Sequence, residues 1–479
     1  MLFRMIYDDT LAQAAYLIGC QKTGEAIVFD PERDVDRYIA LAKKEGVRIT
    51  AVAETHIHAD FVSGARELAE RTGAKVYVSG EGGPDWQTRW LDKKTGGGAY
   101  NHQVLRDGDT FAIGNIEFKA LHTPGHTPEH MCYLVTDRGG GASEPMGVIT
   151  GDFLFVGDVG RPDLLETAAG QAGAKEPSAA ELYRSIRKFL ELPDYLQVWP
   201  AHGAGSACGK ALGAVPQSTL GYERRFNPSL RAAQGDERGF VDFILSGQPE
   251  PPLYFGRMKR INRDGPPVLG SLPRPPRMNP AEFAALDGRA VAIIDTRPWA
   301  AFRAGHVRGA LSIPLDNTFP TLAGSYVRED EPVYLVVDEP RVEEAVRAMV
   351  RVGVDLVRGY ITPADMEAVA AAGAPIETTA EQDADEAKSR LSDPGTFVLD
   401  VRRADEFAAG HIPGALNAVH TRIPALADRV PKDKRILVNC RSGIRSARAS
   451  SYLQRLGYDV TNLAGGFLAW EQSKGPVER

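Results

Sequence analysis

Short apolar runs of four to six residues, separated by polar and glycine-containing segments, recur along the whole chain. Their β-branched and aromatic residues are typical of buried strands, and in the first half these runs lie at 25–30, 49–55, 74–80 and 116–121. Between them, apolar positions with helical spacing predict helices at 34–45 and 65–72. The stretch 80–102 is rich in glycine and has neither period, so we expect an irregular loop there. The first half therefore predicts a mixed α/β domain.

Two segments interrupt this pattern. Residues 248–277 contain PEPP, GPP and PRPP, and proline at that density cannot continue a helix or a central strand. Residues 373–385 change from an alanine-rich helical pattern to an acidic polar sequence. These breaks predict domains at 1–247, 278–376 and 377–479, with a proline-rich linker at 248–277.

The last two of these parts repeat each other. One reads AVAIIDTRPWAAFRAGHVRGALSIP and the other TFVLDVRRADEFAAGHIPGALNAV. Each has an apolar strand ending in Asp-x-Arg, a short helix with phenylalanine, then Gly-His-x-x-Gly-Ala and a second apolar strand. This match indicates an internal duplication. The alternation of strands and helices predicts parallel sheets with helices on their faces.

The composition is that of an ordinary globular protein, with 479 residues, 43% hydrophobic, 25% charged and a net charge of -7. This charge gives no reason to expect nucleic acid or an anionic membrane as partner. No apolar run is long enough to span a bilayer. Asp8 and Asp9 precede any apolar stretch, which argues against a signal peptide. The four cysteines are scattered and form no disulfide framework, so we expect a reducing cytoplasm.

Histidines and aspartates follow several of the predicted strands. They lie in THIHADF at 55–61, TPGHT at 123–127, TGD at 150–152 and PAHG at 200–203. A single histidine in such a place is usually a structural residue. Four signals of this kind in one domain predict instead a metal centre at the strand ends.

These motifs, in this order, resemble the metallo-β-lactamase superfamily, which implies an αββα sandwich with metal at the sheet edges. The common motif H-x-H-x-D-H ends here in Phe61, which cannot ligate, so a dinuclear zinc hydrolase is not expected. The persulfide dioxygenase branch binds one iron, which implies His56, His126 and Asp152 as ligands of one Fe(II) per chain. With two imidazoles and a carboxylate as ligands, Fe(II) keeps positions open for substrate sulfur and O2. Zinc has no accessible redox change and could not activate O2.

The resemblance also implies roles for neighbouring residues. His58 and Asp60 would orient ligands or water around the metal. Arg161, in the family-like sequence GRPD, would hold the carboxylate of a thiol carrier by two hydrogen bonds. A structural salt bridge between Arg161 and Asp163 is the alternative for this arginine.

In the last part, the strand RILVN runs into Cys440 and a helical sequence follows. Backbone N–H groups of the loop, the helix dipole, Arg441 and Arg445 would stabilise an anionic sulfur on Cys440. The sequence C-x-x-G-x-R-S, with LDVR, GHIPGA and GGFLAW around it, is similar to the rhodanese active loop. A phosphatase loop, with one more residue between cysteine and arginine, is the alternative. In the middle part Asp338 replaces the cysteine, which predicts a degenerate domain.

The expected fold class is α/β and α+β multidomain, an αββα sandwich followed by two rhodanese-like parallel-sheet α/β domains. This order resembles the three-domain persulfide dioxygenase–sulfurtransferases of bacterial sulfide detoxification. It implies oxidation of a small-molecule persulfide by O2 to sulfite and thiol, and sulfur transfer through Cys440 to give thiosulfate. Cys208, six residues after His202, is a candidate accessory thiol, and Cys20 is a weaker one.

Two other functions stay open at this point. One is a thioester hydrolase of the glyoxalase II type, and the other is a non-catalytic persulfide sensor or sulfur carrier. The sequence also leaves open the thiol carrier, the direction of sulfur transfer in the cell and whether the chain forms a homo-oligomer. The carriers considered are glutathione, coenzyme A, bacillithiol and inorganic polysulfide.

Overall fold

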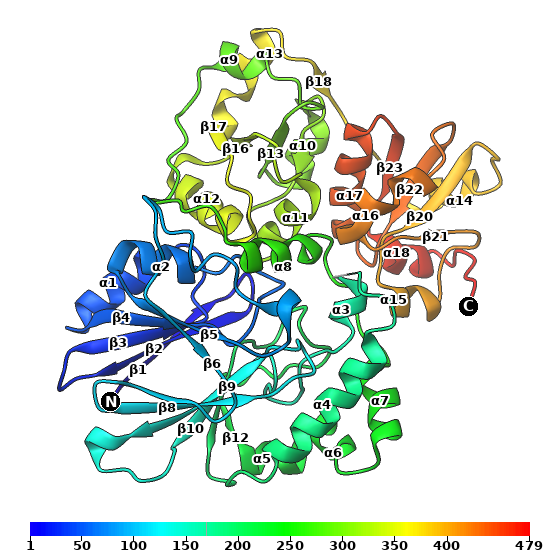
Figure 1. The fold of residues 1–479 in the computed structure, drawn as a ribbon. Helices are drawn as coiled ribbons and strands as arrows, with labels where there is room; N and C mark the ends of the chain where they lie inside the picture. The colour runs from blue at the N-terminus through cyan, green and yellow to red at the C-terminus, as the bar shows by residue number, and fades with distance from the viewer. Residues whose placement is uncertain (169) are drawn as a thin grey trace. The chain divides into compact units, whose positions relative to one another are not determined.

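The computed structural model describes residues 1–168 and 170–479, which form two compact units (Figure 1). Unit 1 is Met1–Leu272 and unit 2 is Pro273–Arg479. None of the helices in the described residues combines the length and the apolar character that a membrane span requires.

Unit 1 is built on two six-stranded sheets, with strand orders β1-β2-β3-β4-β5-β6 and β12-β11-β10-β9-β8-β7. The first sheet contains β1 (Leu2–Asp8), β2 (Gln13–Cys20), β3 (Glu25–Phe29), β4 (Arg48–Ala53), β5 (Lys75–Ser79) and β6 (His102–Leu105). The second contains β7 (Thr110–Ile113), β8 (Ile116–His122), β9 (Met131–Asp137), β10 (Gly147–Gly151), β11 (Gln197–Pro200) and β12 (Ser218–Thr219). The strands β3 to β6 are parallel neighbours, as are β10 and β11, so their carboxyl ends lie at common sheet edges.

The main core of unit 1 lies between the two sheets. Its largest buried side chains are aromatic residues from both sheets: Tyr16, Phe29, Phe118, Tyr133 and Trp199. Apolar helix faces bury the outer side of each sheet. The first sheet is covered by α1 (Asp36–Lys44) and α2 (Ala65–Thr72), and the second by α4 (Lys175–Phe189), α5 (Leu220–Phe226), α6 (Pro228–Ala232) and α7 (Glu237–Leu245). This αββα arrangement confirms the expected sandwich.

The proline-rich segment 248–277 differs from the expected linker. Its middle forms α8 (Phe255–Asp264), and the segment belongs to unit 1 as far as Leu272. The Asn262 side chain donates to the carbonyls of His58 and Phe61, both at 2.8 Å, and accepts from the Ser63 amide at 2.9 Å. The prolines flank this helix and do not interrupt it, so the segment packs against the loop that carries the first histidine motif.

Unit 2 contains two parallel sheets that share one strand order. The first is β15-β13-β16-β17, and the second, β21-β20-β22-β23-β19, adds one edge strand. The strands are β13 (Ala292–Asp295), β15 (Leu311–Ser312), β16 (Val333–Val336), β17 (Val357–Ile361), β19 (Ala380–Gln382), β20 (Thr396–Asp400), β21 (Leu416–Asn417), β22 (Arg435–Asn439) and β23 (Asp459–Leu463). The helices include α10 (Trp299–Ala304), α11 (Phe319–Tyr326), α12 (Val342–Arg351), α14 (Ala384–Arg390), α15 (Ala404–Ala408), α17 (Ile444–Arg455) and α18 (Gly466–Gln472). The common strand order confirms that the sequence repeat is a structural duplication.

The repeated Asp-x-Arg motif has the same structural role in both copies. Arg297 pairs with Asp295 at 2.6 Å and donates to the Gly305 carbonyl at 2.8 Å. Arg402 pairs with Asp400 at 2.6 Å and donates to the carbonyl of the equivalent glycine at 2.7 Å. In both copies the arginine therefore connects the end of the strand to the Gly-His turn, and its role is structural.

The two copies interlock along α17. Arg455 forms a buried ion pair with Glu331 and donates to the Gly288 carbonyl at 2.8 Å. The Ser451 hydroxyl accepts from the Ser312 amide at 2.9 Å. These buried contacts explain why the two rhodanese-like parts form a single compact unit.

Candidate metal centre and candidate sulfur-transfer site

Three predicted metal ligands converge at the strand ends of unit 1. His56 follows β4, His126 lies in the loop after β8, and Asp152 follows β10. Their ligand atoms lie within 4.8 Å of one another, and all three residues are buried. Asp152 Oδ2 is 3.9 Å from His56 Nε2 and 3.5 Å from His126 Nε2.

The polar atoms of this group fit a metal ion. Within residues 1–168 and 170–479, His56 Nε2 and both carboxylate oxygens of Asp152 have no hydrogen-bond partner. Buried polar atoms without partners are costly, so an unpartnered set that converges on one point is typical of a ligand set. Burial lowers the pKa of both His56 and His126, which keeps the rings in the neutral form that binds a metal.

The remaining ring nitrogens are held by neighbouring groups. His56 Nδ1 lies 2.9 Å from the Thr55 hydroxyl, and His126 Nδ1 lies 3.2 Å from the Arg161 carbonyl. Such contacts fix the orientation of ligand rings. Gly125 allows the His126 loop to approach α4, because a Cβ there would lie 2.5 Å from the Cα of Leu182. The sequence Pro-Gly-His is thus explained by close packing of the loop against a helix.

His58 points away from this group into a cluster of carboxylates. Its Nε2 lies 2.9 Å from Glu54 Oε2 and 3.2 Å from Asp30 Oδ1. Burial opposes the charged ring, but the Asp30 charge and the hydrogen bonds to Asp30 and Glu54 together raise the pKa of His58 well above its usual value. The His58 ring also packs beside His56, with centroids 4.2 Å apart. His58 therefore supports a ligand and is not part of the ligand group.

A second group of donors adjoins the first and includes Cys208, the candidate accessory thiol. His202 Nε2 lies 3.2 Å from Asp60 Oδ2 and 3.3 Å from Asp152 Oδ1. Cys208 completes this group, whose ligand atoms all lie within 4.8 Å. Burial and the nearby carboxylates raise the pKa of Cys208 to about 12, so the free thiol is protonated. The second group therefore contains a thiol from the glycine-rich loop after His202.

Arg161 does not fit its expected role as a substrate anchor. Its guanidinium is buried and bonded to Asp163 through Nε at 2.9 Å and Nη2 at 2.7 Å. It also donates to the carbonyls of Ala207 at 3.0 Å and Pro249 at 2.7 Å. Four of its five N–H donors are occupied inside the protein. The structural salt bridge, kept as the alternative, is what the structure contains.

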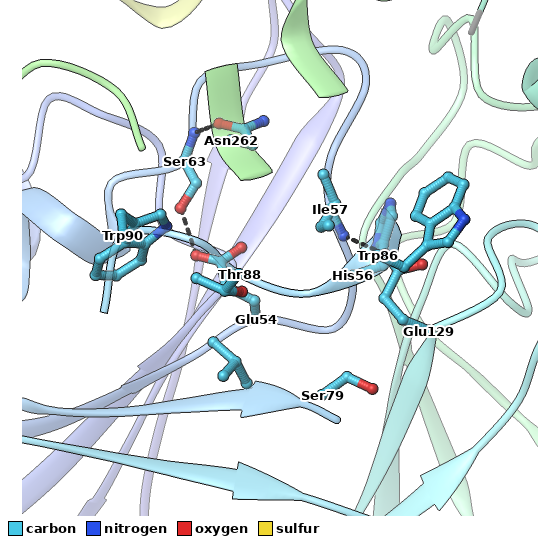
Figure 2. A pocket seen from close by; sticks show the side chains of 11 residues that line it. Glu54, His56, Ile57, Ser63, Ser79, Trp86, Thr88, Trp90, Glu129 and Asn262 are labelled. Carbon is cyan, nitrogen blue, oxygen red and sulfur yellow. Dashed lines mark hydrogen bonds between the residues drawn. The ribbon is translucent and has the colours of Figure 1, made fainter. Parts of the chain in front are cut away.

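A small cavity lies beside His56 (Figure 2). It has a volume of about 30 Å³, and its walls include Trp86, Trp90, Glu54 and Glu129. Burial raises the pKa of Glu129 to about 7. This cavity could not be predicted, because Trp86 and Trp90 lie in the glycine-rich stretch that has no regular period.

Cys440 lies in unit 2 at the end of β22 and immediately before α17, as predicted. Its Sγ accepts hydrogen bonds from the Gly443 amide at 3.1 Å and the Ser446 hydroxyl at 3.4 Å. Arg445 is engaged by Glu406 in two hydrogen bonds of 2.7 and 2.8 Å, so its charge is largely offset. Arg441 is exposed. Backbone and hydroxyl donors therefore stabilise the sulfur, and Arg445 also interacts with Cys440 while it is paired with Glu406.

The middle copy has no thiol at the equivalent place. β16 pairs with β13 in the same register in which β22 pairs with β20, and this places the buried Val337, and not Asp338 as expected, at the position of Cys440. The exposed residues Asp338 and Glu339 follow before α12 begins. Carboxylates there would repel an anionic sulfur. The prediction of a degenerate copy stays a prediction, and the geometry gives no second sulfur-transfer loop in the described residues.

The two units match two known families. The family described as the Metallo-beta-lactamase superfamily matches residues 8–202, and the Rhodanese-like domain matches 279–361 and 383–473. The crystal structure of a metallo-beta-lactamase from Staphylococcus aureus subsp. aureus COL is 41% identical, with a TM-score of 0.67. The match covers 76% of this chain and 99% of that chain, so it extends beyond unit 1.

Two further relatives match about half of the chain. A probable metallo-hydrolase from Burkholderia pseudomallei (strain 1710b) is 30% identical over 244 residues, 47% of this chain and 79% of its own. The crystal structure of ETHE1 from Myxococcus xanthus is 29% identical with a TM-score of 0.43, covering 55% of this chain and 99% of that one.

Proposed function

The chain belongs to the metallo-beta-lactamase superfamily and carries two rhodanese-like domains behind that domain, and from this premise we propose that it is a persulfide dioxygenase coupled to a sulfurtransferase. In the first reaction, a persulfide R–S–SH, O2 and water give the thiol R–SH, sulfite and two protons. In the second, sulfite takes the outer sulfur of a Cys440 persulfide and leaves as thiosulfate. The observation that carries the proposal is the buried, converging group of His56, His126 and Asp152, in one chain with Cys440.

His56, His126 and Asp152 would hold one Fe(II) per chain. When bound, iron supplies the redox exchange with O2 that zinc lacks, and a three-ligand set leaves room for both reactants. The protein's own part is to keep the two imidazoles neutral, to orient them through Thr55 and the Arg161 carbonyl, and to exclude bulk water by burial.

The sulfur-transfer step needs a thiolate that can accept and release sulfane sulfur. Cys440 attacks the outer sulfur of a second persulfide, the S–S bond of that persulfide breaks, and R–SH leaves. Sulfite then attacks the outer sulfur on Cys440, and the electron pair of the broken bond returns to Sγ. The Gly443 amide and the Ser446 hydroxyl are placed to stabilise this charge. The partners of the protein would then be small-molecule persulfides, O2, sulfite and thiosulfate, and its four free cysteines suit a reducing cytoplasm.

The test is anaerobic purification with iron, followed by metal analysis and O2 uptake on persulfides of glutathione, cysteine, coenzyme A and bacillithiol. We expect one iron per chain and one O2 consumed per sulfite formed. Asp152→Asn should abolish uptake, because it removes the charged ligand, while the matched exposed change Asp85→Asn should not affect it. Two tightly bound zinc ions per chain, with no O2 uptake on any persulfide, would refute the proposal.

A metal-dependent thioester hydrolase is the second candidate, and the group of Asp60, His202 and Cys208 favours it. This group adjoins Asp152 and could hold a second metal ion, and one relative is described as a probable metallo-hydrolase. Cys208→Ser separates the two functions. A hydrolase would lose one of two metal ions and its thioester hydrolysis, whereas the dioxygenase would keep one iron per chain.

A further inference from the structure

The cavity beside His56 is lined by a buried carboxylate, Glu129, one oxygen of which has no hydrogen-bond partner in the described residues. Two of its eleven lining residues, Glu54 and Glu129, are carboxylates, and none is lysine or arginine (Figure 2). Because His56 is also a predicted metal ligand, a group in this cavity would lie close to a substrate at the metal centre. The question is which group the cavity accepts.

Glu54 and Glu129 each have one carboxylate oxygen without a hydrogen-bond partner in the described residues, but they differ in the groups beside them. The carboxylate of Glu54 contacts the Ser63 hydroxyl and lies 2.9 Å from His58 Nε2. Glu129 accepts one hydrogen bond from the Ile57 amide at 2.8 Å, but its Oε2 has no partner in the described residues although only 2% of the side chain surface is exposed. A buried carboxylate oxygen of this kind is stabilised by a donor, and best by a cationic one.

The size of the cavity and its aromatic walls restrict which donor group can bind there. A volume of about 30 Å³ admits one group the size of a water molecule or an ammonium. Trp86 and Trp90 form walls, and an indole ring attracts a cation. Trp86 already binds one cation outside the cavity, since Lys259 Nζ lies 3.4 Å from its ring centroid. A primary ammonium group satisfies both the carboxylate and the rings.

On the basis of the proposed function, we propose that this cavity binds the primary ammonium group of an aminothiol. The preferred substrates are then persulfides of thiols that carry a free amine a few bonds from the sulfur. A carrier whose amine is acylated, as in a peptide-linked cysteine, lacks this cation and leaves Glu129 Oε2 unpaired. We therefore expect the protein to prefer persulfides of aminothiols such as cysteine to persulfides of N-acylated thiols.

The first test compares two substrates that differ only in the charge on nitrogen. We expect kcat/KM for cysteine persulfide to exceed that for N-acetylcysteine persulfide by at least about tenfold. Glu129→Gln keeps the shape and the bond from Ile57 but removes the negative charge, so this ratio should fall toward one. Glu81→Gln, which changes a carboxylate outside the cavity, should leave the ratio as it is. An equal ratio in the wild type and Glu129→Gln overturns the inference.

The second test measures binding without turnover, on the full-length protein under nitrogen. Cysteamine should perturb the tryptophan fluorescence, N-acetylcysteamine should not, and Trp86→Phe should reduce the signal. Glu129→Gln should weaken cysteamine binding by at least about tenfold. If no persulfide supports O2 uptake while cysteamine still binds through Glu129, the proposed function fails and the cavity assignment stands. If cysteamine and N-acetylcysteamine bind equally, or if neither binds, the cavity holds only water and the inference is wrong.

Discussion

At the scale of single residues, Arg161 and Arg445 are held by carboxylates of the protein itself. Arg161 is bound by Asp163 and two carbonyls, and Arg445 by Glu406. A guanidinium engaged in this way positions backbone and loops, and little of it remains for substrate. The carbonyl of Arg161 also faces His126, so this residue acts on the metal centre through its main chain.

We predict that Arg161→Ala lowers stability and does not selectively raise KM. The change leaves Asp163 buried without its partner, which costs about 3–5 kcal/mol. Urea denaturation measures this loss, and Arg138→Ala, which breaks an exposed pair with Glu117, should cost no more than about 1 kcal/mol. A variant with normal stability and a raised KM would restore the role of substrate anchor.

We predict that Cys440→Ser keeps most of its O2 uptake but shifts the product from thiosulfate to sulfite. A hydroxyl cannot carry sulfane sulfur, so the thiosulfate yield should fall by at least about tenfold. Chromatography of sulfur products, with O2 uptake recorded in parallel, checks both parts. Thiosulfate at the wild-type ratio would move the transfer step to another thiol, and Cys208 would be examined first.

At the scale of helices and strands, most elements could be predicted from their apolar periods, but their long-range contacts could not. The strands before Cys440 and the metal ligands ended where expected. Helix α8 was missed because the flanking prolines dominated the interpretation, although buried Phe255, Met258 and Asn262 have helical spacing. The place of Cys208 beside His202 depends on the path of a loop, which a one-dimensional pattern does not contain.

The ion pair between α15 and α17 gives a prediction for pH dependence. Hydrogen bonds from Arg445, opposed by partial burial, lower the pKa of Glu406 from 4.5 to about 2. Because the folded pKa is the lower one, the pair stabilises the protein above about pH 4.5 and this contribution is lost as pH falls toward 2. The stability difference between wild type and Glu406→Gln should therefore be largest near neutral pH and shrink below pH 4.5. Denaturant midpoints from pH 7 to 3 measure it, and a constant difference would contradict the assignment.

At the scale of the whole molecule, oxidation and sulfur transfer are assigned to different compact units. Under the proposed function, each unit contains the residues for its own step, and a single chain would keep sulfite at a raised effective concentration near Cys440. The two rhodanese-like copies are not separable in the same way, since Arg455 of one copy is buried against Glu331 of the other. The unit to isolate is therefore Pro273–Arg479 and not the middle copy alone.

We predict that the fragment Pro273–Arg479 transfers sulfur from thiosulfate to a thiol, and that Cys440→Ser in this fragment abolishes the activity. The middle copy has Val337 where a cysteine would lie, followed by Asp338, so no second carrier remains. A sulfurtransferase assay on both fragments, with circular dichroism to verify folding, decides this. Residual turnover in a folded Cys440→Ser fragment would show that the middle copy is active.

The buried pair of Arg455 and Glu331 also bears on how such a chain can change over generations. After a duplication, a copy that loses its nucleophile is usually free to disappear. Here deletion of the middle copy would expose the buried Arg455 side of α17 and leave its charge without a partner. Such a deletion would lower the stability of the last copy, so we expect selection against it even if the middle copy has no activity. Substitutions in the loop after β16 would then be tolerated, whereas substitutions in the face that contacts α17 would not. A middle copy that is inert, as predicted, would then be retained because the last copy needs it for stability.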